Sequence, residues 1–524
     1  MFCSILSAAL LGVDSRLVEV EADVSEGLPM FSMVGYLSSQ VREAQDRVRT
    51  AIKNSGIRLQ PKRITLNMSP ADLRKEGTSF DLPIAIGILG AYGHLRPSSV
   101  ENIMAAGELS LNGEIRPVRG VLPMALMAKE SGCRLFLVPR ENLKEAQAAG
   151  GIAAYGAGNL NEAIDIIEGR SILEKAQDEE RYREGGGEGQ KNDTEPLRHE
   201  REDFSDILGQ EAGKRAAQIA MAGLHNILFI GPPGAGKSLI AKRLPTILPP
   251  MSEEEQLEVS KIYSIAGMLP KGEPLLKTRP FRAPHHTVTA QALAGGGRYP
   301  RPGEVSLAHR GVLFLDELAE FSSSTLEILR QPLEEHSIWI ARMGGSCMFP
   351  ARFVLAAAMN PCKCGYFPDL ERCICTPGQV QRYLGRISQP LLERFDMCVE
   401  IPKAGYDDML SAPPGEDSAG MRAKVCASME IQEERYRGSA YRYNSDLDGE
   451  GISRYCAMDR EAEEIMKSAF YRLDLSVRSY HHVIRTARTI ADLEGSSIIR
   501  GGHAAEAVCY RSADRKYWNR GGIY

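Results

Sequence analysis

The sequence predicts an α/β protein with a parallel sheet in its central part and a helical C-terminal part. Three short apolar runs, 226–230, 311–315 and 353–359, each lead into a glycine-rich or polar segment, which is typical of buried parallel strands. Residues 459–473 and 476–493 instead carry apolar side chains at helical spacing. At 524 residues the chain is too long for one hydrophobic core, and about three domains are expected.

Composition narrows the class of protein. Hydrophobic residues make up 43% and charged residues 25% of the chain, as in soluble globular proteins. The net charge of −5 excludes a molecule that is basic overall, so any contact with nucleic acid has to come from a local patch. No apolar run reaches the length of a membrane span. The eleven cysteines, mostly single, fit a reducing compartment, and we therefore expect a cytoplasmic protein.

Residues 1–170 are expected to form a first, mixed α/β domain. Residues 1–11 are apolar but lack the basic start of a signal peptide, so they are interpreted as a strand. Residues 17–24 alternate apolar and polar side chains, as a half-buried strand does. The other elements expected here are helices over 41–55 and 82–89 and strands over 63–68 and 134–139.

Two segments of this domain resemble the Lon-protease-like domain. Residues 71–81 look like the segment that carries the nucleophilic serine of that family, here Ser79. Residues 107–118 look like the strand pair that precedes its catalytic lysine, but at the lysine position this chain has Leu122. Because a serine is not activated without a neighbouring base, Ser79 is interpreted as structural. The domain is then an assembly or substrate-contact module.

A change of composition marks the end of this domain. Residues 171–203 include the polar, glycine-rich stretch 184–193, which lacks apolar periodicity. Such a stretch cannot bury enough apolar surface to offset the entropy of ordering it. We expect a flexible linker and a domain boundary here.

The central domain, expected over 204–402, contains a phosphate-binding loop of the form G-x-x-x-x-G-K-[ST] between a strand and a helix. Its glycines let backbone N–H groups point at phosphate oxygens, and the N-terminus of the following helix adds partial positive charge. The lysine is expected to reach the β- and γ-phosphates, and the serine to ligate magnesium. The loop consists of Gly231, Pro232, Pro233, Gly234, Ala235, Gly236, Lys237 and Ser238.

The two later apolar runs end in residues that complete an ATPase site. The first ends in Asp316 and Glu317, the Walker B pattern, in which Asp316 is expected to hold magnesium and Glu317 to polarise the attacking water. The second ends in Asn360. This order of motifs resembles that of AAA+ ATPases, which implies a sensor-1 role for Asn360 between the two Walker strands. An asparagine that caps a strand before Pro361 is compatible with that role.

The resemblance to AAA+ ATPases also implies arginines that act on the nucleotide. One arginine reaches into the neighbouring subunit, where its planar fork suits charge on the γ-phosphate. Arg394 is the first candidate for this finger and Arg386 the second, and a surface arginine is the alternative for either. After a connecting segment, 403–449, a helical lid domain is expected over 450–524. There Arg478 fits the sensor-2 arginine, which closes the lid onto the nucleotide.

Three longer phrases extend the resemblance to almost the whole chain: FRAPHHT (281–287), RPGEVSLAH (301–309) and ARTIADL (487–493). With the Lon-like start, the motor and the helical tail, they are similar to the YifB/ComM family of magnesium-chelatase-like AAA+ ATPases. The resemblance implies a hexameric ring with ATP between subunits, and a DNA helicase or branch-migration motor linked to natural transformation. Two alternatives stay open: a magnesium-chelatase-type ATPase subunit, and a chaperone-like or protease-related ATPase that does not act on DNA.

Residues 338–346 are expected to form a β-hairpin before the sensor-1 strand, because alternating side chains lead into two glycines. The segment resembles the hairpin that points into the ring pore in the chelatase and MCM branch. Arg342 would then contact DNA phosphate in a sequence-independent, salt-sensitive way. A solvated hairpin arginine is the alternative.

Four cysteines follow Asn360 as two C-x-C pairs separated by eight residues: Cys362, Cys364, Cys373 and Cys375. Four thiolates suit tetrahedral zinc, although zinc knuckles commonly use C-x2-C spacing. A structural zinc site and four free thiols both stay open. The pairs His285-His286 and His481-His482 are not interpreted as metal ligands, because adjacent residues on a helix point in different directions.

Overall fold

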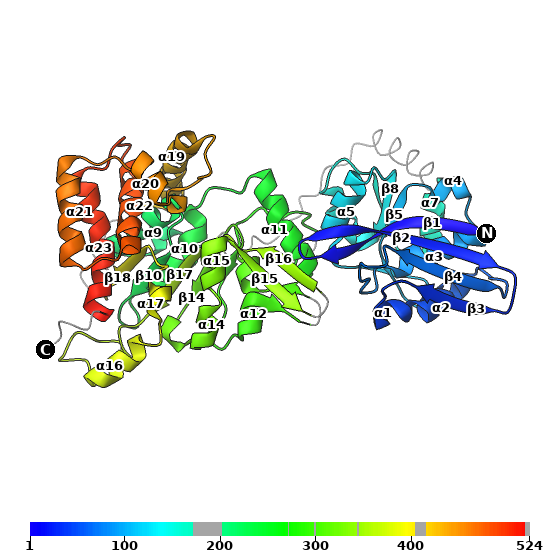
Figure 1. The fold of residues 1–524 in the computed structure, drawn as a ribbon, viewed down its shortest axis with the longest axis horizontal. Coiled ribbons are helices and arrows are strands. Elements are labelled where there is room, and N and C mark those ends of the chain that lie inside the picture. Colours follow the sequence, from blue (N-terminus) through cyan, green and yellow to red (C-terminus); the bar gives the residue numbers. More distant parts are fainter. Residues whose placement is uncertain (171–201, 271, 298–299, 343–344, 404–414, 519–524) are drawn as a thin grey trace.

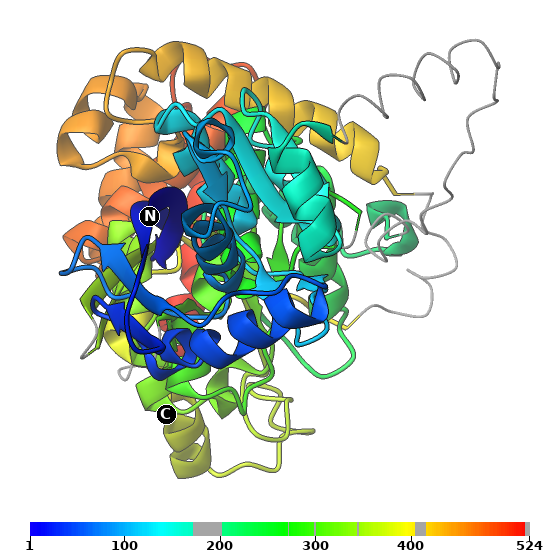
Figure 2. The ribbon, with the colours of Figure 1, turned by 90° about the vertical axis from the view of Figure 1, so that its right-hand side faces the viewer.

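The computed structural model describes residues 1–170, 202–270, 272–297, 300–342, 345–403 and 415–518, apart from the side chains of residues 342, 514 and 515. The molecule is elongated, with an N-terminal sheet at one end, a second sheet in the middle and C-terminal helices at the other end (Figure 1). Seen along the long axis, the N-terminal part lies in front of the rest (Figure 2). The expected linker over 171–203 lies, apart from residues 202 and 203, outside the described residues.

The N-terminal part is built on a seven-stranded mixed sheet. Its strands are β1 (Phe2–Leu11), β2 (Asp14–Ser25), β3 (Met30–Val34), β4 (Arg63–Ser69), β5 (Ile103–Ala105), β8 (Leu135–Pro139) and β9 (Ala154–Ala157). They lie in the order β3-β4-β2-β1-β5-β8-β9, and β1 pairs antiparallel with β2 so that Ile5 lies opposite Val20. A separate two-stranded pair is formed by β6 (Glu108–Leu109) and β7 (Ile115–Arg116). The strands expected from the sequence are confirmed.

Helices cover both faces of this sheet. Neighbouring residues of a strand point to opposite faces, and α3 (Asp81–Ala91), buried along its whole length, packs with Ile5, whereas α5 (Val121–Glu130) packs with Leu6 and Ala8. The helix expected over 82–89 is therefore confirmed, and the one expected over 41–55 is divided in two. The other α-helices are α1 (Ser39–Arg42), α2 (Ala44–Asn54), α4 (Pro97–Val100), α6 (Leu143–Gln147) and α7 (Leu160–Ile167).

The central part contains the predicted parallel sheet. Its five strands are β10 (Ile227–Ile230), β11 (Phe281–Arg282), β14 (Val312–Leu315), β17 (Val354–Met359) and β18 (Met397–Glu400). They lie in the order β11-β14-β17-β10-β18, and every pair is parallel. The strand β17 thus lies between the two Walker strands, β10 and β14, as the sequence predicts. Polar residues that follow these three strands are brought to one edge of the sheet.

Short helices surround this sheet, and the phosphate-binding loop leads into one of them. They are α9 (Glu211–Gly223), α10 (Lys237–Arg243), α11 (Glu253–Ala266), α12 (Ala290–Ala294), α13 (Glu304–Leu307), α14 (Ser323–Glu327), α15 (Arg330–Glu335), α16 (Pro377–Leu384) and α17 (Gln389–Leu392). The helix α11 also contacts the N-terminal part. Lys261 pairs with Asp14 at 3.3 Å, and the backbone N–H of Gly120 donates to the carbonyl of Ser264.

The predicted hairpin is confirmed as β15 (Ser337–Arg342) and β16 (Gly345–Pro350). Gly12, in the turn between β1 and β2, lies against this hairpin, because an added Cβ at Gly12 would stand 3.1 Å from the carbonyl oxygen of Met348. Its φ of +65° favours glycine as well. The β1–β2 hairpin therefore touches the β15–β16 hairpin (Figure 1). A smaller hairpin joins β12 (Gly295–Gly296) to β13 (Arg301–Pro302).

The C-terminal part is helical. Its helices are α19 (Ser418–Tyr436), α20 (Gly449–Tyr455), α21 (Arg460–Arg472), α22 (Val477–Leu493) and α23 (Gly501–Trp518). The helices expected over 459–473 and 476–493 are confirmed as α21 and α22, with Asp459 and Ser476 as their N-caps. The sequence did not predict α19, because its buried side includes the polar residues Ser428 and Gln432 and so lacks a continuous apolar stripe.

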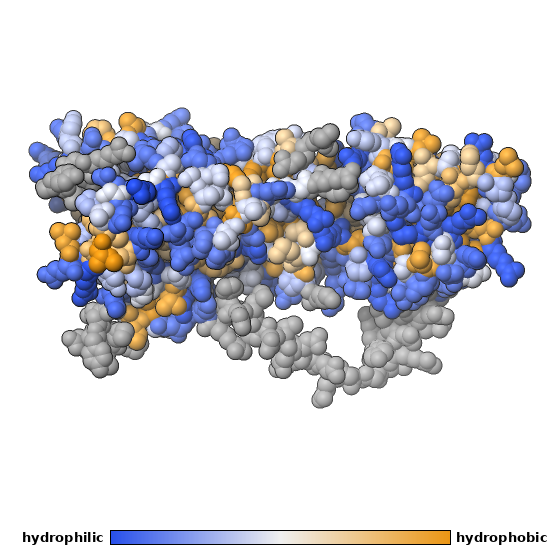
Figure 3. All heavy atoms as spheres, turned by 90° about the horizontal axis from the view of Figure 1, so that it is seen from below, coloured by the Kyte–Doolittle hydropathy of each residue, from blue (hydrophilic) through white to orange (hydrophobic). Residues whose placement is uncertain are grey.

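Across the part of the chain that the structure describes, no helix combines the length and the apolar character needed to cross a membrane. The face drawn in Figure 3 is mainly hydrophilic, and its hydrophobic residues lie in separate small patches.

Candidate functional site

The phosphate-binding loop is shaped by glycines at three positions. Gly234 and Gly236 have φ values of +76° and +86°, which side chains rarely adopt. Gly231 has no space for a side chain, since an added Cβ would stand 2.1 Å from the carbonyl oxygen of Ile401. The loop ends where α10 begins, at Lys237. The motif therefore has the strand–loop–helix setting that it requires.

Lys237 joins this loop to the end of β17. Its ammonium donates to the carbonyls of Gly231 and Pro232, at 2.7 and 2.8 Å, and to Oδ1 of Asn360 at 3.1 Å. Burial lowers the pKa of Lys237 to about 8, although the nearby Asp316 carboxylate acts in the opposite direction. A phosphate at this loop would meet a cation that is already held in place.

Ser238 and Asp316 lie together as the sequence predicts. The hydroxyl of Ser238 donates to Oδ2 of Asp316 at 2.7 Å, and the backbone N–H of Glu317 donates to Oδ1 of Asp316 at 2.9 Å. One hydroxyl and one carboxylate oxygen in contact are ligands of the kind that magnesium prefers. These residues therefore fit a magnesium ion bound together with nucleotide.

Glu317 follows Asp316 in an unusual backbone conformation. Its φ is +52°, a region that non-glycine residues rarely occupy, and its side chain is 59% exposed. Its Oε2 lies 3.1 Å from Nδ1 of His286. His285 and His286 lie after β11 outside any helix, so the helical geometry assumed for this pair was wrong. The sequence did not identify His286 as a neighbour of Glu317. We call Lys237, Ser238, Asp316, Glu317 and Asn360 the nucleotide face.

Arg394 of the central part and Arg478 of the helical part both contact the carboxylate of Glu334. Arg394 lies between α17 and β18 with a side chain only 7% exposed, and its Nη2 pairs with Oε1 of Glu334. Nη1 of Arg478 lies 3.3 Å from the same oxygen. Burial, followed by the charge of Arg478, lowers the pKa of Arg394. We call Glu334, Arg394 and Arg478 the arginine face.

Arg386, the second candidate for the finger, has a different position. Its Nη1 donates to Oε2 of Glu320 at 2.7 Å and to the carbonyl of Ala319 at 3.0 Å, and its side chain is 48% exposed. It therefore lies beside the segment that follows Walker B. Arg342 is the last residue of β15, and its side chain lies outside the described residues.

The Lon-like segment contains no comparable set of contacts. Ser79 is nearly buried, and Leu122 is fully buried in the apolar cluster of α5. Lys75, four residues before Ser79, donates its buried ammonium to the carbonyl of Pro70. Asp81 is held by Arg47, whose Nε and Nη2 donate at 2.8 and 2.9 Å. Lys75 and Asp81 therefore bond within the domain, in agreement with a structural role.

Comparison with known proteins assigns all three parts to one group. Residues 203–409 match the family described as magnesium chelatase, subunit ChlI. Residues 20–142 match subunit ChlI of Mg-chelatase, and residues 415–511 match the C-terminal family of the same subunit. The chain is also 41% identical to competence protein ComM of Haemophilus influenzae, over 98% of this chain and 97% of that protein.

The chain belongs to the YifB/ComM family of magnesium-chelatase-like AAA+ ATPases. It is 41% identical to the uncharacterized protein YifB of Escherichia coli K12, over 97% of this chain and 96% of that protein. Similarity to the magnesium-chelatase 38 kDa subunit of Rhodobacter capsulatus is weaker, at 26% identity over 38% of this chain and 55% of that protein. The family implies ATP and magnesium as ligands.

Two of the phrases that carry the family resemblance meet in space. Arg282 of the first phrase donates from Nε and Nη2 to both carboxylate oxygens of Glu304, in the second, at 2.7 and 2.8 Å. His286 of the first phrase reaches Glu317. The sequence did not predict the role of Glu334, because a single glutamate in a short helix gives no sign of the arginines that it contacts.

Proposed function

We propose that this chain hydrolyses ATP as one protomer of a homo-oligomeric, hexameric ring. The observation that carries the proposal is that one chain has both a nucleotide face and an arginine face, and that each forms its own set of contacts. In a ring with head-to-tail contacts, the arginine face of one protomer meets the nucleotide face of the next. The complete site would then exist only between subunits.

Each residue of the nucleotide face has a role in this proposal. Lys237 binds the β- and γ-phosphates, and Ser238 and Asp316 would hold magnesium, which neutralises phosphate charge when it is bound. Glu317 accepts a hydrogen bond from the attacking water and draws its proton away, and Asn360 orients that water. The pair of Glu317 with His286 supports this role, because the imidazole fixes the carboxylate beside the loop.

The arginine face would supply the cation that stabilises the transition state. Arg394 is the proposed finger, because its planar fork matches the charge that develops on the γ-phosphate. Arg478, expected from the sequence to close the lid onto the nucleotide, would instead act beside Arg394 on the nucleotide of the neighbouring protomer, since both arginines bind Glu334. To act on a neighbouring nucleotide, Arg394 has to exchange the carboxylate of Glu334 for phosphate oxygens. Glu334 thus holds the two arginines together until the next protomer presents its nucleotide.

We further propose that the ring acts in the cytoplasm on single-stranded or branched DNA, as a helicase or branch-migration translocase linked to natural transformation or recombination. The name of the H. influenzae relative, a competence protein, supports a link to DNA uptake. The β15–β16 hairpin supports a contact with DNA through Arg342 at its end. The contact of Gly12 with β16 supports a role for the N-terminal part in assembly or substrate contact.

The test is ATP turnover of the full-length chain with and without forked DNA. We expect forked DNA to raise turnover, and the variant Arg342→Ala to lose the increase while it keeps the basal rate. Arg460→Ala is the matched control, because that side chain is 92% exposed on α21. Failure of DNA to change either turnover or assembly would contradict the DNA-motor proposal.

A second candidate is a magnesium-chelatase-type ATPase subunit. The ChlI family matches and the similarity to the R. capsulatus subunit favour it. That similarity covers only 38% of this chain and does not account for the full-length match to ComM. Turnover that responds to chelatase partner subunits but not to DNA would favour this second function. A chaperone-like or protease-related ATPase is the third, and would respond to neither.

A further inference from the structure

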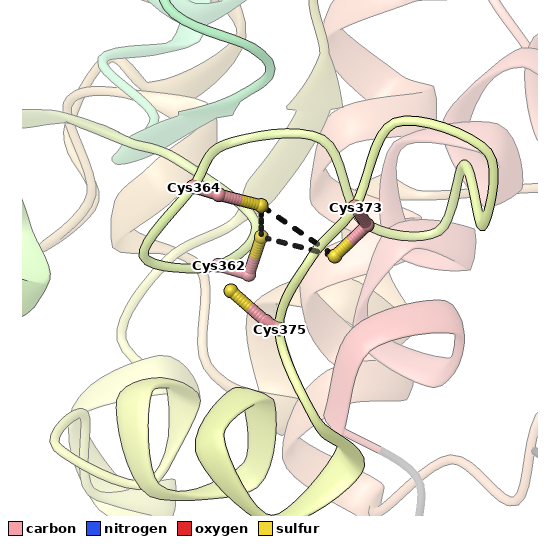
Figure 4. A group of neighbouring side chains, drawn as sticks. All are labelled: Cys362, Cys364, Cys373 and Cys375. Carbon is pink, nitrogen blue, oxygen red and sulfur yellow. Dashed lines mark hydrogen bonds between the residues drawn. The ribbon is translucent and has the colours of Figure 1, made fainter.

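The loop between β17 and α16 brings four sulfur atoms together (Figure 4). The Sγ atom of Cys362 lies 3.3 Å from that of Cys364 and 3.7 Å from that of Cys373, and Cys364 lies 3.6 Å from Cys373. With Cys375 included, all four sulfurs lie within 4.8 Å of one another. The four side chains point toward a common centre from two segments of the same loop, one with Cys362 and Cys364 and one with Cys373 and Cys375.

These separations fit a single tetrahedral metal ion. A zinc ion with Zn–S bonds of about 2.3 Å holds its four sulfurs about 3.8 Å apart, close to the observed values. A disulfide would need sulfurs about 2 Å apart, and it would use only two of the four. An iron–sulfur cluster would spread the thiolates over several irons and hold them farther apart. The donor set is all sulfur, which selects zinc over magnesium or calcium.

The backbone around Cys362 supports a charged sulfur at this position. The N–H groups of Gly365 and Phe367 both point at its Sγ, at 3.2 and 3.4 Å. Cys362 is itself fully buried. A buried thiolate needs such donors or a bound cation to offset the loss of water. The ring of Phe367 lies 6.3 Å from that of Tyr517 in α23, so the loop is also fixed against the C-terminal helix.

We propose that Cys362, Cys364, Cys373 and Cys375 bind one zinc ion, and that the resulting knuckle braces the phosphate-binding loop. Gly365 lies directly against that loop, since an added Cβ would stand 2.4 Å from Cδ of Pro233. Asn360, which bonds Lys237, stands two residues before Cys362. The zinc would thus fix both the loop and the sensor-1 residue. This second part rests on the proposed ATPase function, whereas zinc binding does not.

Metal analysis tests the zinc site without any reference to activity. The full-length chain, purified without chelators, is expected to contain stoichiometric zinc, and Cys373→Ser is expected to lose it. Cys509→Ser is the matched control, because that cysteine is exposed on α23. Should Cys373→Ser not fold, cobalt exchanged into the wild-type chain is expected to give the thiolate charge-transfer and tetrahedral d–d bands of a four-sulfur site. Two results would overturn the zinc site. One is protein purified without metal that does not bind cobalt with the bands of a four-sulfur site, and the other is a disulfide among the four cysteines.

The bracing role is tested with Gly365→Ala. The added Cβ would overlap the ring of Pro233. In addition, the φ of +89° at Gly365 is one that alanine rarely adopts, so the phosphate-binding loop has to shift. We expect zinc to be retained and the Kd for a fluorescent ATP analogue to rise about tenfold. Gly378→Ala is the control, because its added Cβ meets no atom within 4 Å. An unchanged Kd with zinc retained would overturn the bracing role, whereas failure of the wild-type chain to bind nucleotide would contradict the proposed function instead.

Discussion

The nucleotide face and the arginine face differ in where their charged groups find partners. On the nucleotide face, Lys237 bonds the loop carbonyls and Asn360, and Ser238 bonds Asp316. On the arginine face, Arg394 and Arg478 converge on Glu334. In the proposed function the first face binds a phosphate and a metal cation, whereas the second holds two arginine cations on the carboxylate of Glu334. This difference is what a catalytic site divided between two subunits requires.

Removal of Arg394, the proposed finger, should have the largest effect. We expect Arg394→Ala to lower the turnover of assembled protein by about 10³- to 10⁵-fold, because an arginine finger stabilises charge only in the transition state. Nucleotide binding should stay intact, since Arg394 is not part of the nucleotide face. The measurement is kcat together with the Kd of ATP. Arg386→Ala is the control, and loss of turnover in Arg386→Ala but not in Arg394→Ala would move the finger to Arg386.

Neutralising Glu317 should have the next largest effect, on the other face. Glu317→Gln keeps the shape of the side chain but removes the base, and general-base catalysis contributes about 10²- to 10⁴-fold. We expect a protein that binds ATP and remains assembled but does not hydrolyse it. Rapid-quench analysis of bound nucleotide should find ATP rather than ADP. Bound ADP at wild-type rates would show that another group activates the water.

Neutralising Glu334, whose carboxylate contacts both arginines, should lower the rate by a smaller factor. Glu334→Gln removes the charge that orients Arg394 and Arg478, and misplacing a catalytic group costs about ten- to a hundredfold in rate. We expect kcat to fall while the Kd of ATP stays unchanged. Glu335→Gln is the matched control, because Glu335 is the next residue and bonds only Gln331 among its described hydrogen bonds. Equal rates in the two variants would contradict an orienting role for Glu334.

Acid should weaken the packing of α22 against the central sheet. Asp396, two residues after Arg394, contacts His482 of α22 and lies 3.9 Å from Nδ1 of His225. Complete burial lowers the pKa of His225 to about 4. In the unfolded chain His225 takes up a proton near pH 6.5, whereas in the folded chain it takes up the proton only near pH 4. Stability therefore falls as the pH drops through this window, by about 1 to 2 kcal/mol between pH 6.5 and 5.

Thermal unfolding at pH 7, 6 and 5 checks this expectation. The midpoint temperature should fall with the pH in the wild-type chain. His225→Gln, which cannot take up the proton, should reduce the slope, and the remaining slope is expected from His482, whose pKa burial also lowers to about 4. An equal slope in both proteins would assign the acid sensitivity to other groups.

The residues of the nucleotide face could be predicted from the sequence because they follow buried strands. Asp316 and Asn360 come directly after apolar runs, and parallel strands carry such residues to the same edge. Only part of the arginine face could be predicted from the sequence. Arg394 and Arg478 were found by their place in a family pattern, but their common partner Glu334 was not, because the contact joins residues 334 and 478 of the chain. His286 was missed for the same reason.

The helix α19 was missed for a different reason. Its buried positions include Ser428 and Gln432, and the amide of Gln432 donates to the carbonyl of Ala222 at 2.9 Å. Polar residues that are buried because they meet a specific backbone group give no apolar periodicity. Only the tertiary structure reveals such a partner.

The most direct test of the divided site is to mix two inactive variants. Lys237→Ala lacks a working nucleotide face but keeps its arginine face, and Arg394→Ala has the reverse defect. When the two are co-assembled in equal amounts, about a quarter of the interfaces combine an intact loop with an intact finger, so turnover should recover to about a quarter of the wild-type rate. Mixtures that stay as inactive as the two separate variants would contradict a catalytic site shared between protomers.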